Sequence, residues 1–179
     1  MSSNESDSEL EQFHNEPRMT SEELVVELTR FHAGQNAKNF NTYDFISAFG
    51  SPLEAVMYSK LFWPDFIELE GMVIRSDVID DESDRNRIIE SLQLCNYEVQ
   101  QLEYSVNRLD IPYGVFATRR AYECSEIVMK EMLKTLVEMW RARLSLLFQD
   151  RRFNVLLEID DDGTYFITSC QQQCDDLRA

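Results

Sequence analysis

The run VMKEMLKTLVEMWRARLSLLF, residues 128–148, decides how this chain folds. When successive side chains are placed about 100° apart around a helix axis, its apolar residues cover a broad arc. The polar side chains on the other side are Lys130, Glu131, Lys134, Glu138, Arg141 and Ser145. An arc this wide exceeds the stripe of a helix that lies on a surface. We therefore expect a central helix that other elements cover from more than one direction.

Two strand patterns follow this helix. Residues 153–159 alternate apolar and polar side chains, and residues 164–168 are rich in β-branched and aromatic residues. The sequence between them, Asp160-Asp161-Asp162-Gly163, has the composition of a tight turn. Turn chemistry accounts for the adjacent aspartates without a metal. The pattern predicts a β-hairpin.

A second helical pattern precedes the central helix. Its apolar positions alternate in steps of four and three, as in a heptad repeat, at Ile88, Leu92, Cys95, Val99, Leu102, Val106 and Leu109. We expect one helix, capped by Ser83 or Asp84, followed by a turn over residues 110–114. This helix would lie antiparallel to the central helix. A homodimer through the 88–109 seam is the competing use of the same pattern.

Three shorter helices are predicted earlier in the chain. Thr20 and Glu23 have the spacing of a capping box, and residues 39–49 form a short apolar helical pattern before Gly50. Ser51 followed by Pro52 is a strong helix start, and Pro64 ends that helix.

Together these patterns predict an α+β fold with about five helices, in which a long antiparallel helical pair packs against a small antiparallel β-sheet. Residues 66–74, 153–159 and 164–170 would supply the strands. We expect a single domain over residues 20–170. An acidic disordered tail would occupy residues 1–19, and a polar C-terminal tail residues 171–179.

The net charge of the chain narrows the classes of partner that it is expected to bind. The chain has 17 basic and 33 acidic residues and a formal net charge of −16. Nucleic acid and anionic membrane surfaces both attract basic proteins, so neither is an expected partner. Residues 65–84 hold eight acids and one arginine, whereas residues 118–152 have a small basic excess. The acids either keep the protein soluble or steer a basic protein toward it.

Signatures of catalysis are absent from the sequence. There is no phosphate-binding glycine loop, nucleophile elbow or zinc-protease motif, and only two histidines occur. Four cysteines without a CxxC pair predict neither a zinc site nor a disulfide framework. We therefore assign no catalytic residue, no metal ligand and no cofactor. The acidic N-terminal residues do not have the pattern of a signal sequence, and no run of apolar residues is long enough to span a membrane. We therefore expect a cytoplasmic protein.

The most distinctive local sequence is LFWPDFIELEGMVI, residues 61–74. Its aromatic residues either form a small core of their own or present Trp63 as a recognition anchor beside Asp65, Glu68 and Glu70. Arg143 breaks the apolar arc of the central helix. Its stem either packs while the guanidinium reaches solvent, or it pairs with a carboxylate from residues 65–70.

These observations favour a non-enzymatic acidic binding protein that engages a basic protein partner. An immunity-type inhibitor of a toxin or nuclease is its most concrete form, because such partners are basic. The predicted binding residues are Trp63, Asp65, Glu68, Glu70 and Arg143. One alternative is a hydrolase or transferase that uses carboxylates in a cleft near Trp63. Another is a structural homodimer through the 88–109 seam.

Overall fold

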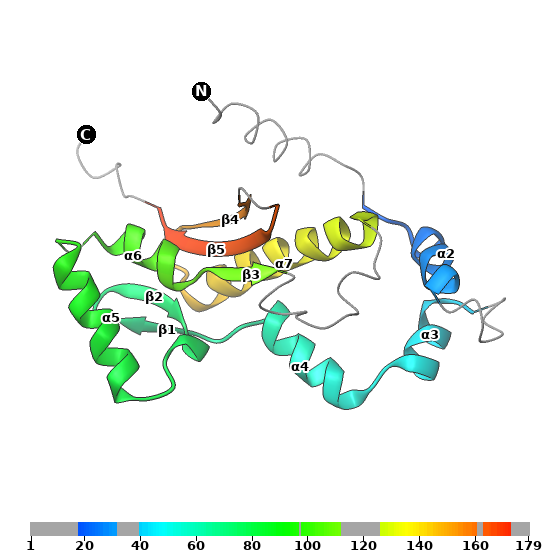
Figure 1. The fold of residues 1–179 in the computed structure, drawn as a ribbon, viewed down its shortest axis with the longest axis horizontal. Helices are drawn as coiled ribbons and strands as arrows, with labels where there is room; N and C mark the ends of the chain where they lie inside the picture. The colour runs from blue at the N-terminus through cyan, green and yellow to red at the C-terminus, as the bar shows by residue number, and fades with distance from the viewer. Residues whose placement is uncertain (1–17, 32–39, 97, 112–125, 161–162, 173–179) are drawn as a thin grey trace, which may run out of the picture.

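The computed structural model describes residues 18–31, 40–96, 98–111, 126–160 and 163–172. Its helices are α2 (Ser21–Phe31), α3 (Thr42–Phe49), α4 (Pro52–Phe62), η1 (Ser76–Val78, a 3-10 helix), α5 (Glu82–Leu94), α6 (Val99–Val106) and α7 (Glu126–Leu147). Its strands are β1 (Phe66–Leu69), β2 (Met72–Arg75), β3 (Leu109–Ile111), β4 (Phe153–Ile159) and β5 (Tyr165–Gln171). Helices together with small antiparallel sheets confirm the α+β class (Figure 1). The parts of the predicted tails at 1–17 and 173–179 lie outside the described residues.

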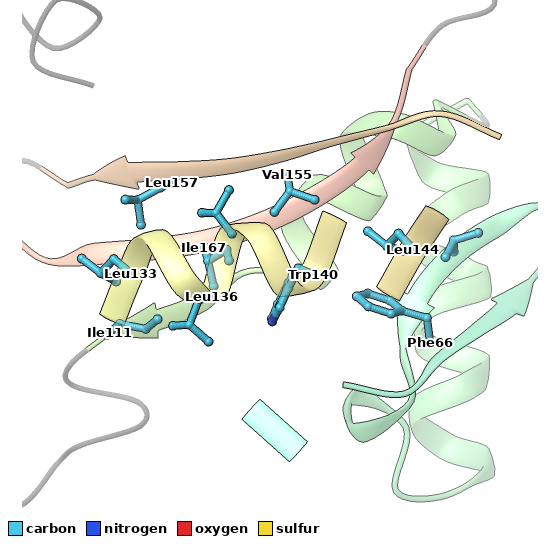
Figure 2. Close-up of a cluster of buried hydrophobic side chains, with 11 residues drawn as sticks. Phe66, Ile111, Leu133, Leu136, Trp140, Leu144, Val155, Leu157 and Ile167 are labelled. Atoms are coloured by element: carbon cyan, nitrogen blue, oxygen red, sulfur yellow. The ribbon is translucent and has the colours of Figure 1, made fainter. Parts of the chain in front are cut away.

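Helix α7 is the central element that its sequence predicts. Its 22 residues extend about 33 Å at the rise of an α-helix. The buried side chains along it are Leu133, Leu136, Val137, Trp140 and Leu144. Figure 2 shows α7 below β4 and β5, whose side chains Val155, Leu157 and Ile167 complete the same core cluster. Helix α4 also contacts α7, and its Leu61 and Phe62 pack against this cluster. A sheet and a second helix thus cover the wide arc, although Leu146 and Leu147 at its end are exposed.

The predicted single helix over residues 88–109 is wrong. Helix α5 ends at Leu94, α6 begins at Val99, and residues 109–111 form β3 instead of leading into a turn. Asn96 has a φ of +53°, a left-handed conformation that asparagine tolerates better than most residues and that commonly ends a helix. The helix also starts earlier than expected, because the Asp81 side chain accepts from the backbone N–H groups of Ser83 and Asp84.

Three apolar residues of the predicted seam are buried within their own chain, and the other four are half-buried. Ile88, Leu92 and Leu102 belong to a second core cluster together with residues of the β1–β2 hairpin, which are Leu69, Met72 and Ile74. Helix α6 lies against β5 and β2, so it does not form the predicted long antiparallel pair with α7. The seam proposed for a homodimer therefore does not exist as one continuous stripe.

The predicted strands form two sheets instead of one. Strands β1 and β2 pair in an antiparallel hairpin in which Leu69 lies opposite Met72, with Glu70 and Gly71 at positive φ in the turn. The second sheet has the order β3-β5-β4. Strands β4 and β5 are the predicted hairpin, and Gly163 in its turn has a φ of +82°. Strand β3 has only three residues and was not predicted.

Asn107, directly after α6, lies between the two sheets and is fully buried. Its Nδ2 group donates to the carbonyl oxygens of Val73 in β2 and Ser169 in β5, both at 2.9 Å. Its Oδ1 atom accepts from the backbone N–H of Arg75 at 2.8 Å. One amide side chain therefore satisfies backbone groups of β2 and of the part of β5 that extends beyond its pairing with β3.

Glu103 lies one helical turn earlier and reaches the same gap. Its side chain is fully buried, and its two oxygens accept from the backbone N–H groups of Val73, at 2.5 Å, and Gln171, at 2.7 Å. The Gln171 side chain adds a third bond at 2.6 Å. Glu103 and Asn107 occupy the place of the backbone hydrogen bonds that would join β2 to β5. This arrangement separates the sheets, which the strand patterns alone do not reveal.

We expect the stability of the protein to depend on pH through Glu103. Burial raises the pKa of Glu103 above its ordinary value of 4.5, against the opposing effect of its hydrogen bonds from Gln171 and Val73. The native state then holds this proton more tightly than the unfolded state. The contribution of Glu103 to the free energy of unfolding is therefore full below the ordinary pKa and declines as the pH rises through the raised native pKa.

The measurement is urea unfolding of the wild type and of Glu103→Gln between about pH 4 and pH 7. The glutamine variant does not titrate at this position, so the effects of all other groups cancel in the difference. We expect the advantage of the wild type over the variant to shrink as the pH rises. A growing advantage would contradict the raised pKa.

Candidate partner-binding surface

Helix α4 and the turn after it position the predicted recognition corner. The Ser51 side chain caps α4 by accepting from the backbone N–H of Glu54, and Pro52 occupies the first turn. At the other end, the backbone N–H of Trp63 donates to Ser59 at 2.8 Å, and Pro64 prevents continuation of the helix. The chain then enters β1. Trp63 itself is half-buried, so it is not a fully presented anchor.

Arg143 pairs with a carboxylate from the 65–70 segment, which is the second of its two predicted uses. Its Nη2 atom lies 2.9 Å from Oδ1 of Asp65, and its Nε–H donates to the carbonyl oxygen of Pro64 at 3.2 Å. Its guanidinium carbon lies 5.5 Å from the centre of the Trp63 ring. The side chain is 18% exposed. Arg143 thus ties α7 to the turn between α4 and β1, and Trp63, Asp65 and Arg143 form one cluster.

The Asp65 carboxylate forms ion pairs with two cationic side chains, Lys60 and Arg143. Lys60 lies 2.8 Å from its Oδ2 atom, and this pair, followed by Arg143, holds the pKa of Asp65 below its ordinary value of 3.8. We expect Lys60→Met and Arg143→Met each to raise the pKa of Asp65, with the larger change in Lys60→Met. A carboxyl NMR titration measures both.

Arg87→Met is the matched control for this titration, because Arg87 pairs with Asp84 on α5 at 2.8 Å. It should leave the pKa of Asp65 unchanged. If Lys60→Met also leaves this pKa unchanged, the ion pair does not set the charge of the corner.

The other two predicted residues lie elsewhere. Glu68 points toward Arg151, with 2.9 Å between Oε2 and Nη2. Glu70 is exposed in the β1–β2 turn, at the end of the hairpin opposite Asp65. The five predicted residues therefore do not form a single site. The structure joins three of them and places Glu68 and Glu70 along the hairpin.

The acidic run at 77–84 serves local structure. Asp81 caps α5, Asp77 pairs with Arg75, and Asp84 pairs with Arg87. Acids at the start of a helix also complement its dipole. Within the described parts of the chain, no group of three or more histidine, cysteine, aspartate or glutamate side chains could hold a metal ion.

An exposed apolar surface on α4 was not among the predicted binding residues. Its apolar side chains point in every direction around the helix axis, yet no residue of α4 is buried. Leu53, Val56 and Met57 are 70%, 60% and 64% exposed, and Tyr43 and Ile46 on the preceding helix α3 are exposed too. In Figure 1, α2 and α3 lie to one side of the sheets, and α4 connects them to β1.

The sequence of α4 does contain an indication of this surface. A helix that is apolar all around normally lies inside a protein, and the sequence of α4 has apolar residues all around its axis. Which surface a fold leaves open depends on tertiary structure, which the residue pattern of one helix does not reveal.

Comparison with known proteins gives no further assignment, since no protein-family model, curated protein or solved structure matches this chain. Among the helices that the structure describes, none is both long and apolar enough to cross a membrane.

Proposed function

We propose that this protein is an acidic binding protein that engages a basic protein partner through α4. The supporting observation is the contrast between the sequence of α4, which suits a fully covered helix, and its exposure, since no residue of α4 is buried. Contiguous apolar side chains at a surface are typical of interaction sites. The net charge of −16 would steer a basic partner toward this surface.

An inhibitor of a basic toxin or nuclease is the most concrete form of this function. Such inhibitors combine fast electrostatic association with a few apolar contacts that slow dissociation. We place this interaction in the cytoplasm, where thiols stay reduced, in keeping with the free thiols of Cys95 and Cys170.

The carboxylate-based enzyme is less favoured by the geometry near Trp63. Asp65 is bound by two cations and has a lowered pKa, whereas a general acid or base needs a pKa near the working pH. A neutralised, paired carboxylate suits a structural corner.

The test is affinity capture with the immobilised full chain. We expect the wild type to retain a basic protein at low salt and to release it at high salt, because screening weakens the charge attraction. The double variant Leu53→Ser/Met57→Ser should retain much less of it. Leu94→Ser is the matched control, because Leu94 is 83% exposed on α5 and lies outside the proposed surface.

Two results would refute the proposal. One is that no basic protein is retained at low salt. The other is that the double variant retains the partner as well as Leu94→Ser does, which would leave α4 without a role.

A further inference from the structure

We infer that the partner presents an amphipathic helix with basic side chains, and that this helix lies along the α4 stripe, which we define as Leu53, Val56 and Met57. The inference rests on the proposed function and adds the structural class of the bound segment. It follows from the spacing of the stripe, from its direction relative to the core, and from the charges at its two ends.

The spacing fits helix-to-helix contact. Leu53, Val56 and Met57 occupy positions i, i+3 and i+4, so their side chains lie on one face of α4. A second helix uses the same spacing for its own apolar residues, and two such faces pack ridges into grooves. The 11 residues of α4 extend about 16 Å, enough to contact about three turns of a partner helix.

The stripe faces away from the core of its own chain. Leu53, Val56 and Met57 are 70%, 60% and 64% exposed. Phe62, which packs against the α7 core cluster, lies on the opposite side of α4 at about 100° per residue. Leu61 packs there too, at the C-terminal end of the helix. Substituting the exposed stripe residues therefore removes few contacts within the chain. Binding and folding can be tested separately.

The charges near the α4 stripe favour a partner helix with basic side chains. Glu54 is exposed at the start of the stripe, and Asp44 is exposed on the neighbouring α3. Lys60 follows the stripe at the next helical position, but Asp65 neutralises it at 2.8 Å. The charged side chains of α3 and α4, which are Asp44, Glu54 and Lys60, are thus net acidic. A second copy of the chain, also at −16, would meet like charge, so charge complementarity favours a basic helix over self-association.

The experiment uses three synthetic peptides about five turns long. The first is an amphipathic leucine–lysine helix, the second replaces every lysine by glutamate, and the third is a scrambled leucine–lysine sequence without an apolar face. Binding to the full chain is measured by calorimetry at low and physiological salt. Each titration is repeated with Val56→Ser/Met57→Ser and with the control Leu94→Ser.

We expect the amphipathic lysine peptide to bind at least about tenfold more tightly than the other two peptides, because only this peptide matches both the apolar face and the charge. The stripe variant should lose about tenfold in affinity, since the truncated side chains bury less apolar surface. The control should match the wild type. Circular dichroism shows whether the variants keep the native helix content.

Three outcomes would overturn the inference. Equal binding of the amphipathic and scrambled lysine peptides, unaffected by the stripe variant, would mean that charge alone acts; a basic partner would then remain, but the helical mode would fail. No binding of either lysine peptide would remove the basic helix as the occupant, even if affinity capture still retained a basic protein. A dimer in sedimentation that Val56→Ser/Met57→Ser abolishes would identify a second copy as the occupant.

Discussion

Replacing Trp140 by alanine is expected to lower the free energy of unfolding by about 4 kcal/mol, the largest effect of any single substitution proposed for this chain. Trp140 is fully buried at the point where α7, α4 and β1 meet. Its ring packs edge-to-face on Phe66, with 5.7 Å between ring centres, and its Nε1–H donates to the carbonyl oxygen of Leu61 at 3.0 Å. Alanine would leave a cavity and an unsatisfied carbonyl group.

Urea unfolding followed by circular dichroism measures this loss, and Trp63→Ala is the matched control. Trp63 is half-buried, so its truncation should cost about 1–2 kcal/mol. Trp140→Phe should cost about 1–2 kcal/mol, because it keeps most of the ring volume but removes the hydrogen bond and part of the indole ring. Equal losses for the two tryptophan-to-alanine variants would contradict the central position of Trp140.

Asn107→Ala is expected to cost about 3 kcal/mol. The substitution removes two donated hydrogen bonds and one accepted bond, and it leaves backbone groups of Val73, Arg75 and Ser169 buried without these partners. Asn107→Asp should cost a similar amount although it preserves the volume, because a carboxylate cannot donate to the two carbonyl oxygens.

Asn154→Ala is the control for the Asn107 variants. The Asn154 side chain also makes a hydrogen bond, to Gln172, but on the exposed side of β4. We expect this substitution to change the free energy of unfolding by no more than about 0.5 kcal/mol in the same urea experiment. If Asn107→Asp were as stable as the wild type, the hydrogen bonds between the sheets would not matter for stability.

The elements that the sequence predicts well are those with a local cause. The apolar arc of α7, the start of α4 at Ser51 and Pro52, and the turn at Gly163 each depend on residues close together in the chain. Their periodicity and turn chemistry are sufficient to identify them.

The break between α5 and α6 could not be predicted in the same way. The four-and-three spacing of apolar residues continues through Cys95 to Val99 as if the helix did too. That spacing does not indicate that Asn96 adopts a positive φ. It also does not indicate that Ile88 and Leu92 pack against the β1–β2 hairpin. A seam of three repeats is short enough to arise from two separate helices.

The candidate site also has features with a local cause and features that depend on tertiary structure. Arg143 is a charged residue that interrupts an apolar arc. This local anomaly left two alternatives, a packed stem with the guanidinium in solvent or a pair with a carboxylate of the 65–70 segment, and the structure shows the pair. The separation of Glu68 and Glu70 from that pair depends on which side of the hairpin each residue faces. The exposure of α4 depends on where the rest of the chain packs.

The side chains of Glu103 on α6 and of Asn107 directly after it also determine how the molecule opens. The amide protons of Val73, Arg75 and Gln171 belong to strands in different sheets, yet all three are bonded to Glu103 or Asn107. Detachment of α6 would release them together, so their native-state hydrogen exchange should follow one common opening event rather than one event per sheet. Helix α6 therefore makes two sheets behave as a single cooperative unit.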